Sequence, residues 1–326
     1  MNAEHPLFKQ VIILVNPWST HIAAARQRIA QLQTVCKDCL VYILEIQNDP
    51  RHSTTELLDV YKHALGPETL LCVAGGDGTV NAVVQYLMAE TSPKKAAHTV
   101  VLPLWGGNAN DLAHMLNGPA YLTSGKELLR KGKVVPIHPL KCELTNPDGK
   151  MEQYSASAYV GFGVSAMTAK RLNTLIHRNS AWHKYPGGRF IREFMIGAET
   201  FAKISTFHIR EDGHDRAIYE RIFINGSRIG KVQALPLKLT DKAFFNVTVQ
   251  GRKTKLLALG NYLREVFRRP TAELTTGATF VCLDHAWGQA DGETFAVVPG
   301  TQVRVYRSEQ PFYALSTKLV PRRRKS

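Results

Sequence analysis

The chain has 326 residues, which is long enough for two domains of ordinary size, each with its own hydrophobic core. Its 41 lysine and arginine residues against 27 aspartate and glutamate residues leave a formal net charge of +14. This charge favours anionic partners, namely nucleic acid, an acidic membrane surface or phosphorylated small molecules, without choosing among them.

Two protein classes are excluded by the distribution of apolar residues and cysteines. No run approaches the ~18 consecutive apolar residues of a membrane-spanning helix, and the first apolar run, Val11–Val15, is too short for the core of a signal peptide. The five cysteines are an odd number, and only Cys36 and Cys39 have the spacing of metal ligands, with no second pair to complete a site. We therefore expect reduced thiols and a cytosolic protein.

Strand-like and helix-like segments alternate over the first 118 residues. The pattern predicts strands at 11–15, 40–46, 70–74 and 99–102. It predicts helices at 21–35 and 56–65, a third helix that follows the glycine-rich stretch and ends at Leu87, and a short fourth helix that ends at Gly118; residues 49–54 are expected to form a loop. Such alternation is typical of a parallel sheet with helices on both faces. Ligands of these sheets bind beyond the carboxyl ends of the strands.

The third strand runs directly into a glycine-rich turn, Gly75-Gly76-Asp77-Gly78-Thr79. Without side chains at the glycines, backbone N–H groups can point at an anion, and the following helix directs its positive end to the same place. Asp77 cannot hold phosphate directly, so it is expected to cap, to orient Thr79, or to meet a metal or a ribose hydroxyl. Taken alone, the stretch could also be a tight strand-to-helix turn.

Polar or glycine-rich loops follow three of the predicted strands. They are Asn16–Ser19, Gly75–Thr79 and Gly106–Asp111. Because the carboxyl ends of parallel strands meet at one edge of the sheet, we expect the three loops to converge. Their convergence predicts a nucleotide site.

Short strand-like runs replace the alternation beyond about Val134. They lie at 134–137, 141–144, 154–160, 205–209, 221–225, 244–249, 279–283, 294–298 and 302–306. Turns such as Glu211-Asp212-Gly213 separate them, and a basic, aromatic-containing loop or helix interrupts them between residues 170 and 200. This pattern predicts an antiparallel, β-rich second domain.

The motifs, taken in order, resemble those of a known family. They are Asn16-Pro17, Gly75–Thr79 with Asn81, Pro103 with Gly107–Ala113, Gly161-Phe162-Gly163 and Asp291-Gly292-Glu293. The set resembles the soluble lipid kinases, which include bacterial diacylglycerol kinases and, more distantly, sphingosine and ceramide kinases.

The resemblance implies an α/β fold of the NAD kinase and diacylglycerol kinase type. An ATP-binding domain would span residues 1–133, with residues 307–326 returning to it, and an antiparallel β-sandwich for the lipid substrate would span residues 134–306. ATP would lie between the domains with Mg²⁺. The residues expected to bind the nucleotide are Asn16, Gly75, Gly76, Asp77, Gly78, Thr79, Asn81, Gly107 and Asn108.

Two carboxylates and one metal ligand complete the implied site. Asp291 and Glu293 would lie near the γ-phosphate, where one carboxylate can accept the proton of the attacking alcohol. Which of the two is the base stays open, and the same residues also suit a plain hairpin turn. Asp241 corresponds to a structural Mg²⁺ ligand of the bacterial enzymes, although Lys242 replaces the usual glycine.

Departures from the family pattern keep other functions open. Asn108 replaces the usual threonine behind an apparent Trp105-Gly106 insertion, and Ser165 stands where an aspartate often follows the Gly-x-Gly motif. A catalytically weak, nucleotide-binding regulator at the membrane is therefore one alternative. NAD kinase is another, because it shares the turn at 75–79. Nucleic acid is not expected, because no recognition motif accompanies the charge.

A lipid kinase must reach a bilayer, and the basic stretches of the chain suit an anionic one. They are Arg322–Lys325, the basic and aromatic residues between His177 and Arg192, and the segment Arg252–Arg269. Each Lys or Arg near an anionic membrane surface contributes about 1 kcal/mol to the free energy of membrane binding. We expect a cytoplasmic protein peripheral to the inner face of the membrane, with ATP and a lipid as partners and a homodimer as a possible assembly.

Overall fold

The computed structural model describes residues 8–47, 50–89, 94–107, 110–118, 124–177, 189–229, 232–233, 239, 243–251 and 273–318. Its helices are α1 (Ile22–Val35), α2 (Pro50–Val60), α3 (Asp77–Met88), α4 (Asp111–Asn117), α5 (Gly125–Lys131), α6 (Val164–His177) and α7 (Arg189–Lys203), with the 3-10 turns η1 (Lys62–Ala64) and η2 (Lys94–His98). Its strands are β1 (Gln10–Val15), β2 (Leu40–Glu45), β3 (Thr69–Ala74), β4 (Val100–Pro103), β5 (Lys133–Ile137), β6 (Leu140–Thr145), β7 (Met151–Ala156), β8 (Tyr159–Gly163), β9 (Phe207–Glu211), β10 (His214–Ile224), β11 (Arg228–Ile229), β12 (Val232–Gln233), β13 (Phe244–Gln250), β14 (Glu273–Thr275), β15 (Gly277–Cys282), β16 (Ala286–Ala290), β17 (Glu293–Val297), β18 (Gln302–Arg307) and β19 (Phe312–Ser316).

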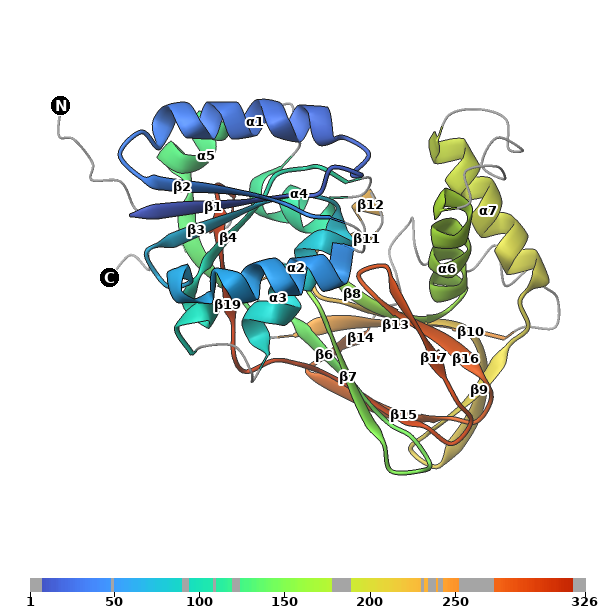
Figure 1. The fold of residues 1–326 in the computed structure, drawn as a ribbon. Helices are drawn as coiled ribbons and strands as arrows, with labels where there is room; N and C mark the ends of the chain where they lie inside the picture. The colour runs from blue at the N-terminus through green and yellow to red at the C-terminus, as the bar shows by residue number, and fades with distance from the viewer. Residues whose placement is uncertain are drawn as a thin grey trace, which may run out of the picture.

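The N-terminal domain is a three-layer sandwich around a sheet of order β2-β1-β3-β4-β19-β5. All neighbouring strands are parallel except β19 and β5, which pair antiparallel. Helices α1 and α5 cover one face of the sheet, and α2 and α3 cover the other (Figure 1). The carboxyl ends of β1, β3 and β4 therefore lie at one edge, as the alternation predicts.

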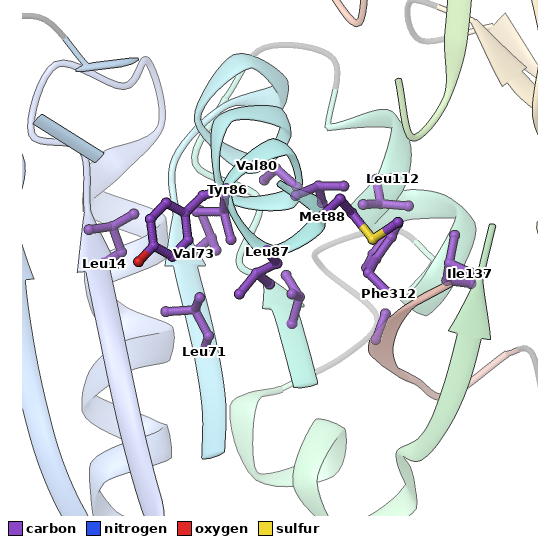
Figure 2. Close-up of a cluster of buried hydrophobic side chains, with 14 of the residues drawn as sticks. Leu14, Leu71, Val73, Val80, Tyr86, Leu87, Met88, Leu112, Ile137 and Phe312 are labelled. Atoms are coloured by element: carbon purple, nitrogen blue, oxygen red, sulfur yellow. The ribbon is translucent and has the colours of Figure 1, made fainter. Parts of the chain in front are cut away.

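The apolar runs of the central strands supply both faces of this sheet. In β1, Val11, Ile13 and Val15 belong to the hydrophobic cluster under α1, whereas Ile12 and Leu14 belong to the cluster under α3. Figure 2 shows the second cluster, where side chains of α3 pack over β3 and β1. Burial on both sides explains why these strands are continuous apolar runs and not alternating ones.

The second domain is an antiparallel sheet that wraps around a core rich in phenylalanine. Its strand order is β17-β16-β8-β10-β9-β15-β18-β6-β7, and β13 pairs with β10 and β14. Helices α6 and α7 pack together on one side of it (Figure 1). The predicted α/β fold class, with a parallel N-terminal sheet and an antiparallel second one, is confirmed.

In the N-terminal domain, three segments differ from the sequence-based expectation. Residues 134–137, expected in the second domain, form most of β5 and pair with β19 in the first sheet, because Val135 and Ile137 are buried in its core. Helix α2 begins at Pro50, inside the predicted loop 49–54, since proline suits the first helical position. Helix α5 was not predicted; Ser124 Oγ caps it by accepting the N–H of Glu127.

Several predicted features lie outside the described residues. These are residues 178–188 of the basic segment, the whole of 252–269 and the C-terminal arginine stretch. Within the part that is described, no helix has both the length and the apolarity that crossing a membrane requires.

Candidate active site

Three loops meet at the carboxyl edge of the N-terminal sheet, and hydrogen bonds join them. Asn16, after β1, donates its N–H to the carbonyl oxygen of Ala74 (2.9 Å), and its Nδ2 donates to Thr79 Oγ1 (2.9 Å). Gly106, after β4, donates its N–H to the carbonyl oxygen of Gly75 (3.0 Å). The structure thus brings together the three loops that the sequence assigns to one site.

The glycines of these loops differ in their surroundings. A Cβ at Gly107 would come within 2.2 Å of Gly76 Cα, and a Cβ at Gly75 would come within 2.6 Å of Thr79 Cβ. These glycines therefore allow close packing between and within the loops. A Cβ at Gly78, in contrast, would meet nothing within 4 Å, so this position faces open space.

The N-terminus of α3 has the properties of an anion site. Gly76 is its N-cap, and the first helical hydrogen bond runs from the N–H of Val80 to the carbonyl oxygen of Gly76 (3.0 Å). The N–H groups between these two residues precede that bond, so the helix itself gives them no acceptor. Together with the positive end of the helix dipole, they favour binding of phosphate oxygens.

Asp77 caps a second helix. Its two carboxylate oxygens accept the N–H groups of Asn110 (2.8 Å) and Asp111 (2.7 Å), at the N-terminus of α4. Of the roles left open for Asp77, the structure shows helix capping. Asp77 is the first residue of α3, but the helix that its carboxylate caps is α4. Burial, followed by the negative charges of Asp111 and Asp291, raises the pKa of Asp77 to about 7.

The loop after β4 is held in place by Trp105. This residue has a left-handed backbone (φ 47°), is buried, and donates from Nε1 to the carbonyl oxygen of Gly118 (3.1 Å), while the guanidinium of Arg28 lies 5.0 Å from its ring centre. Asn110, also left-handed (φ 53°), binds Gly107 through both atoms of its amide. Trp105 and Asn110 therefore support this loop through contacts within the protein.

Asp291 lies in the two-residue turn between β16 and β17. Positive φ at Asp291 (47°) and Gly292 (88°) is the backbone of a type I′ hairpin turn. The carboxylate accepts backbone N–H groups from Ser157 (2.6 Å), Ala158 (3.0 Å) and Tyr159 (2.9 Å). The stretch is thus a hairpin turn whose side chain reaches a distant segment of the chain.

This contact also explains a break in the sheet. The expected single strand 154–160 is divided into β7 and β8, because Ser157 and Ala158 direct their N–H groups to Asp291. Burial raises the pKa of Asp291 to about 7, and the negative charge of Asp111 adds to this rise. The three N–H donors favour the ionised form and therefore oppose it.

The turn of the second domain lies close to the first domain. The charge of Asp291 acts on Asp77, and Glu293, the first residue of β17, accepts a hydrogen bond from Gln85 Nε2 of α3 (3.1 Å). The predicted catalytic pair therefore lies beside the helix whose N-terminus begins at the glycine-rich turn.

The remaining predicted residues divide into two groups. Asn81 is 2% exposed, and its Oδ1 has no hydrogen-bond partner within the described part of the chain, so it can accept a bond from a ligand or water. Asn108 and Asp241 lie outside the described residues. Among the residues that are described, no cluster of three or more His, Cys, Asp or Glu side chains is placed to hold a metal ion.

Sequence reasoning gave two buried carboxylates no role in the site. Asp111 is buried at the start of α4, beside Asp77. Glu220, buried in β10, accepts the N–H (2.7 Å) and the hydroxyl (2.5 Å) of Ser165 at the N-terminus of α6, and burial raises its pKa to about 8. The serine at position 165, where the family pattern often has an aspartate, could have indicated Glu220. A helix N-terminus that lacks an acidic residue of its own can be stabilised by a carboxylate from a neighbouring strand.

Comparison with known proteins shows which fold the chain shares and which family it resembles. No curated protein matches the chain significantly. A crystal structure of a diacylglycerol kinase from Bacillus anthracis str. Sterne is similar over 96% of this chain and 99% of its own, with a TM-score of 0.61 at 15% identity. The crystal structure of yeast NADH kinase complexed with NADH is similar over 96% of this chain and 84% of its own, with a TM-score of 0.51 at 12% identity.

The fold is therefore that shared by diacylglycerol kinases and NAD kinases. Within this class, the family model of the diacylglycerol kinase catalytic domain matches residues 10–142. This stretch holds all three loops of the candidate site. The resemblance to the diacylglycerol kinase family is confirmed.

Proposed function

We propose that this protein is an ATP- and Mg²⁺-dependent lipid kinase, which transfers the γ-phosphate of ATP to a hydroxyl of diacylglycerol or a related lipid. The observation that supports this most directly is the contact between the two domains at α3. Gln85 Nε2 of α3 donates to Glu293 Oε2 (3.1 Å), and the charge of Asp291 is close enough to Asp77, at the N-terminus of α3, to raise its pKa. A phosphate at α3 and an acceptor hydroxyl near the Asp291 turn would share one site.

In this reaction one group of residues would bind ATP, the phosphate donor, and another would act on the hydroxyl of the lipid acceptor. Asn16, residues 75–79, Asn81 and residues 107–108 would hold ATP, whose Mg²⁺ neutralises phosphate charge. The acceptor oxygen bonds to the γ-phosphorus as the bond from that phosphorus to the bridging oxygen breaks, leaving ADP. A carboxylate of the pair Asp291 and Glu293, within ~3 Å of the hydroxyl, would accept its proton.

The net charge of +14 supports a membrane partner. A cationic surface is attracted to an anionic leaflet, where the lipid acceptor is found. We propose that the protein works as a peripheral protein on an anionic surface, with no nucleic-acid partner.

The first test is transfer of radiolabelled γ-phosphate from Mg-ATP to a panel of lipids in mixed micelles, with NAD as a parallel acceptor. We expect label in diacylglycerol or a related lipid, with more turnover in micelles that contain phosphatidylglycerol and less at high salt. Label in NAD alone would replace the proposal by NAD kinase, whose fold is shared. ATP binding without label in any acceptor would favour the regulator.

The pH dependence of turnover provides a second prediction. Because the pKa of Asp291 is raised to about 7, a base role requires kcat/KM for the acceptor to rise with pH, about tenfold per unit below 7, and to level off above it. The measurement is a rate profile from pH 5.5 to 9. Asp77 is raised to about 7 as well, so the Asp77→Asn variant should keep the rise. A flat profile between pH 6 and 8 would contradict the assignment.

A further inference from the structure

One polar contact joins α3 to the Asp-Gly-Glu turn through a side chain that sequence analysis did not identify. Gln85 Nε2 donates to Glu293 Oε2 at 3.1 Å, across 208 positions of the chain. Between Thr79 and Met88, all residues of α3 are buried except Gln85, which is half-buried. A glutamine at this position therefore borders the seam between the domains.

The same side of α3 approaches the turn at two points. Asp77 and Gln85 are separated by eight positions, with Asn81 midway, and residues four apart lie on one side of a helix. Asp77 is close enough to Asp291 to respond to its charge, and Gln85 binds Glu293. Two residues of α3 thus lie close to the two carboxylates on either side of Gly292.

Helix α3 is a rigid link between these contacts and the glycine-rich turn. Gln85 lies seven positions after Gly78, which corresponds to about 10 Å along an α-helix. The apolar side chains of α3 are buried against the sheet, so its ends cannot move independently (Figure 2). A group held by Gln85 is thereby held at a set distance from the N-terminus of α3.

We infer that Gln85 is a positioning residue, which holds the carboxylate of Glu293 at the correct distance from the phosphate end of α3. This inference rests on the proposed function. An amide suits the task, because it donates a hydrogen bond without adding a positive charge that would neutralise Glu293. Gln85 would act through Glu293 and would not touch ATP itself.

The test compares Gln85→Leu with the wild type in the lipid-kinase assay. Leucine keeps similar volume and removes the donor, so we expect kcat to fall about tenfold while KM for ATP, ADP affinity and the melting temperature stay unchanged. Gln85→Glu should lower kcat further than Gln85→Leu does, because it places a second negative charge beside Glu293. Gln31→Leu is the matched control: Gln31 is half-buried on α1 and accepts the N–H of Gly125 (2.9 Å), so kcat should not change.

A double-mutant cycle separates positioning from general damage. In a Glu293→Ala background, Gln85→Leu should change kcat less than twofold, because the partner is already gone. An active wild type with a Gln85→Leu kcat within twofold, or with additive losses in the cycle, would overturn this inference alone. A wild type that labels no acceptor would overturn the proposed function and the inference with it.

Discussion

Asp291→Asn is expected to lower kcat by about 10²- to 10⁴-fold, the usual contribution of a general base, while ATP binding stays near that of the wild type. Asparagine has nearly the shape of aspartate but cannot accept the proton of the acceptor hydroxyl. It also turns an NH₂ group toward backbone N–H donors, because both carboxylate oxygens of Asp291 accept such bonds. A loss of about 1–3 kcal/mol in stability should therefore accompany the loss of turnover.

The protein contains a close control for this substitution. Asp212 and Gly213 form the two-residue turn between β9 and β10 with φ values of 50° and 76°, nearly those of Asp291 and Gly292. Asp212 is exposed, so Asp212→Asn tests the effect of asparagine in the same backbone without a buried carboxylate. Its turnover and melting temperature should match those of the wild type.

Glu293→Gln completes the experiment by identifying the base. Whichever variant loses more kcat at unchanged ATP affinity lacks the proton acceptor. Near-normal activity of Asp291→Asn would remove Asp291 from that role and leave it as the anchor of residues 157–159. Loss of ADP binding together with a large fall in melting temperature would point to the anchor role as well.

Gly78→Ala is expected to weaken ADP and ATP binding at least tenfold, about 1.4 kcal/mol, without lowering stability. The Cβ would meet no protein atom within 4 Å, and alanine favours a helix over glycine, so the melting temperature should stay the same or rise. Side chains on a helix lean toward its N-terminus, which directs the new methyl group at the expected phosphate. Isothermal titration of ADP and a thermal melt measure the two effects.

Gly107→Ala is the informative contrast. There the Cβ would overlap the backbone of Gly76, so the loops must separate, and both affinity and stability should fall. Gly76 itself is less suitable, because its added Cβ would meet Gly107 Cα at 3.2 Å and would test loop packing as much as ligand binding. An unchanged ADP affinity of Gly78→Ala would mean that the glycine-rich turn does not bind phosphate.

Some features of the site are local and could be read from the sequence. The apolar runs such as Val11–Val15, the glycine-rich turn after β3 and the Asp-Gly turn before Glu293 each follow from propensities within a few residues. The convergence of the three loops also followed, because parallel strands align their carboxyl ends.

Other features depend on partners that are distant in the chain. Asp77 binds N–H groups 33 and 34 positions away, and Asp291 binds those of residues 132–134 positions away. No local pattern marks such partners, so the capping of α4, the break between β7 and β8 and the contact of Gln85 with Glu293 were not foreseen.

The alternation of strands and helices in the first domain, the glycine-rich loops and the hairpin turn at Asp291 could all be read from the sequence, because hydrophobic periodicity and turn chemistry act over short stretches. The pairing of β5 with the first sheet and the raised pKa values of Asp77 and Asp291 follow from contacts that exist only in the folded chain. Burial and neighbouring charges cause these shifts, and both depend on residues that are distant in the chain.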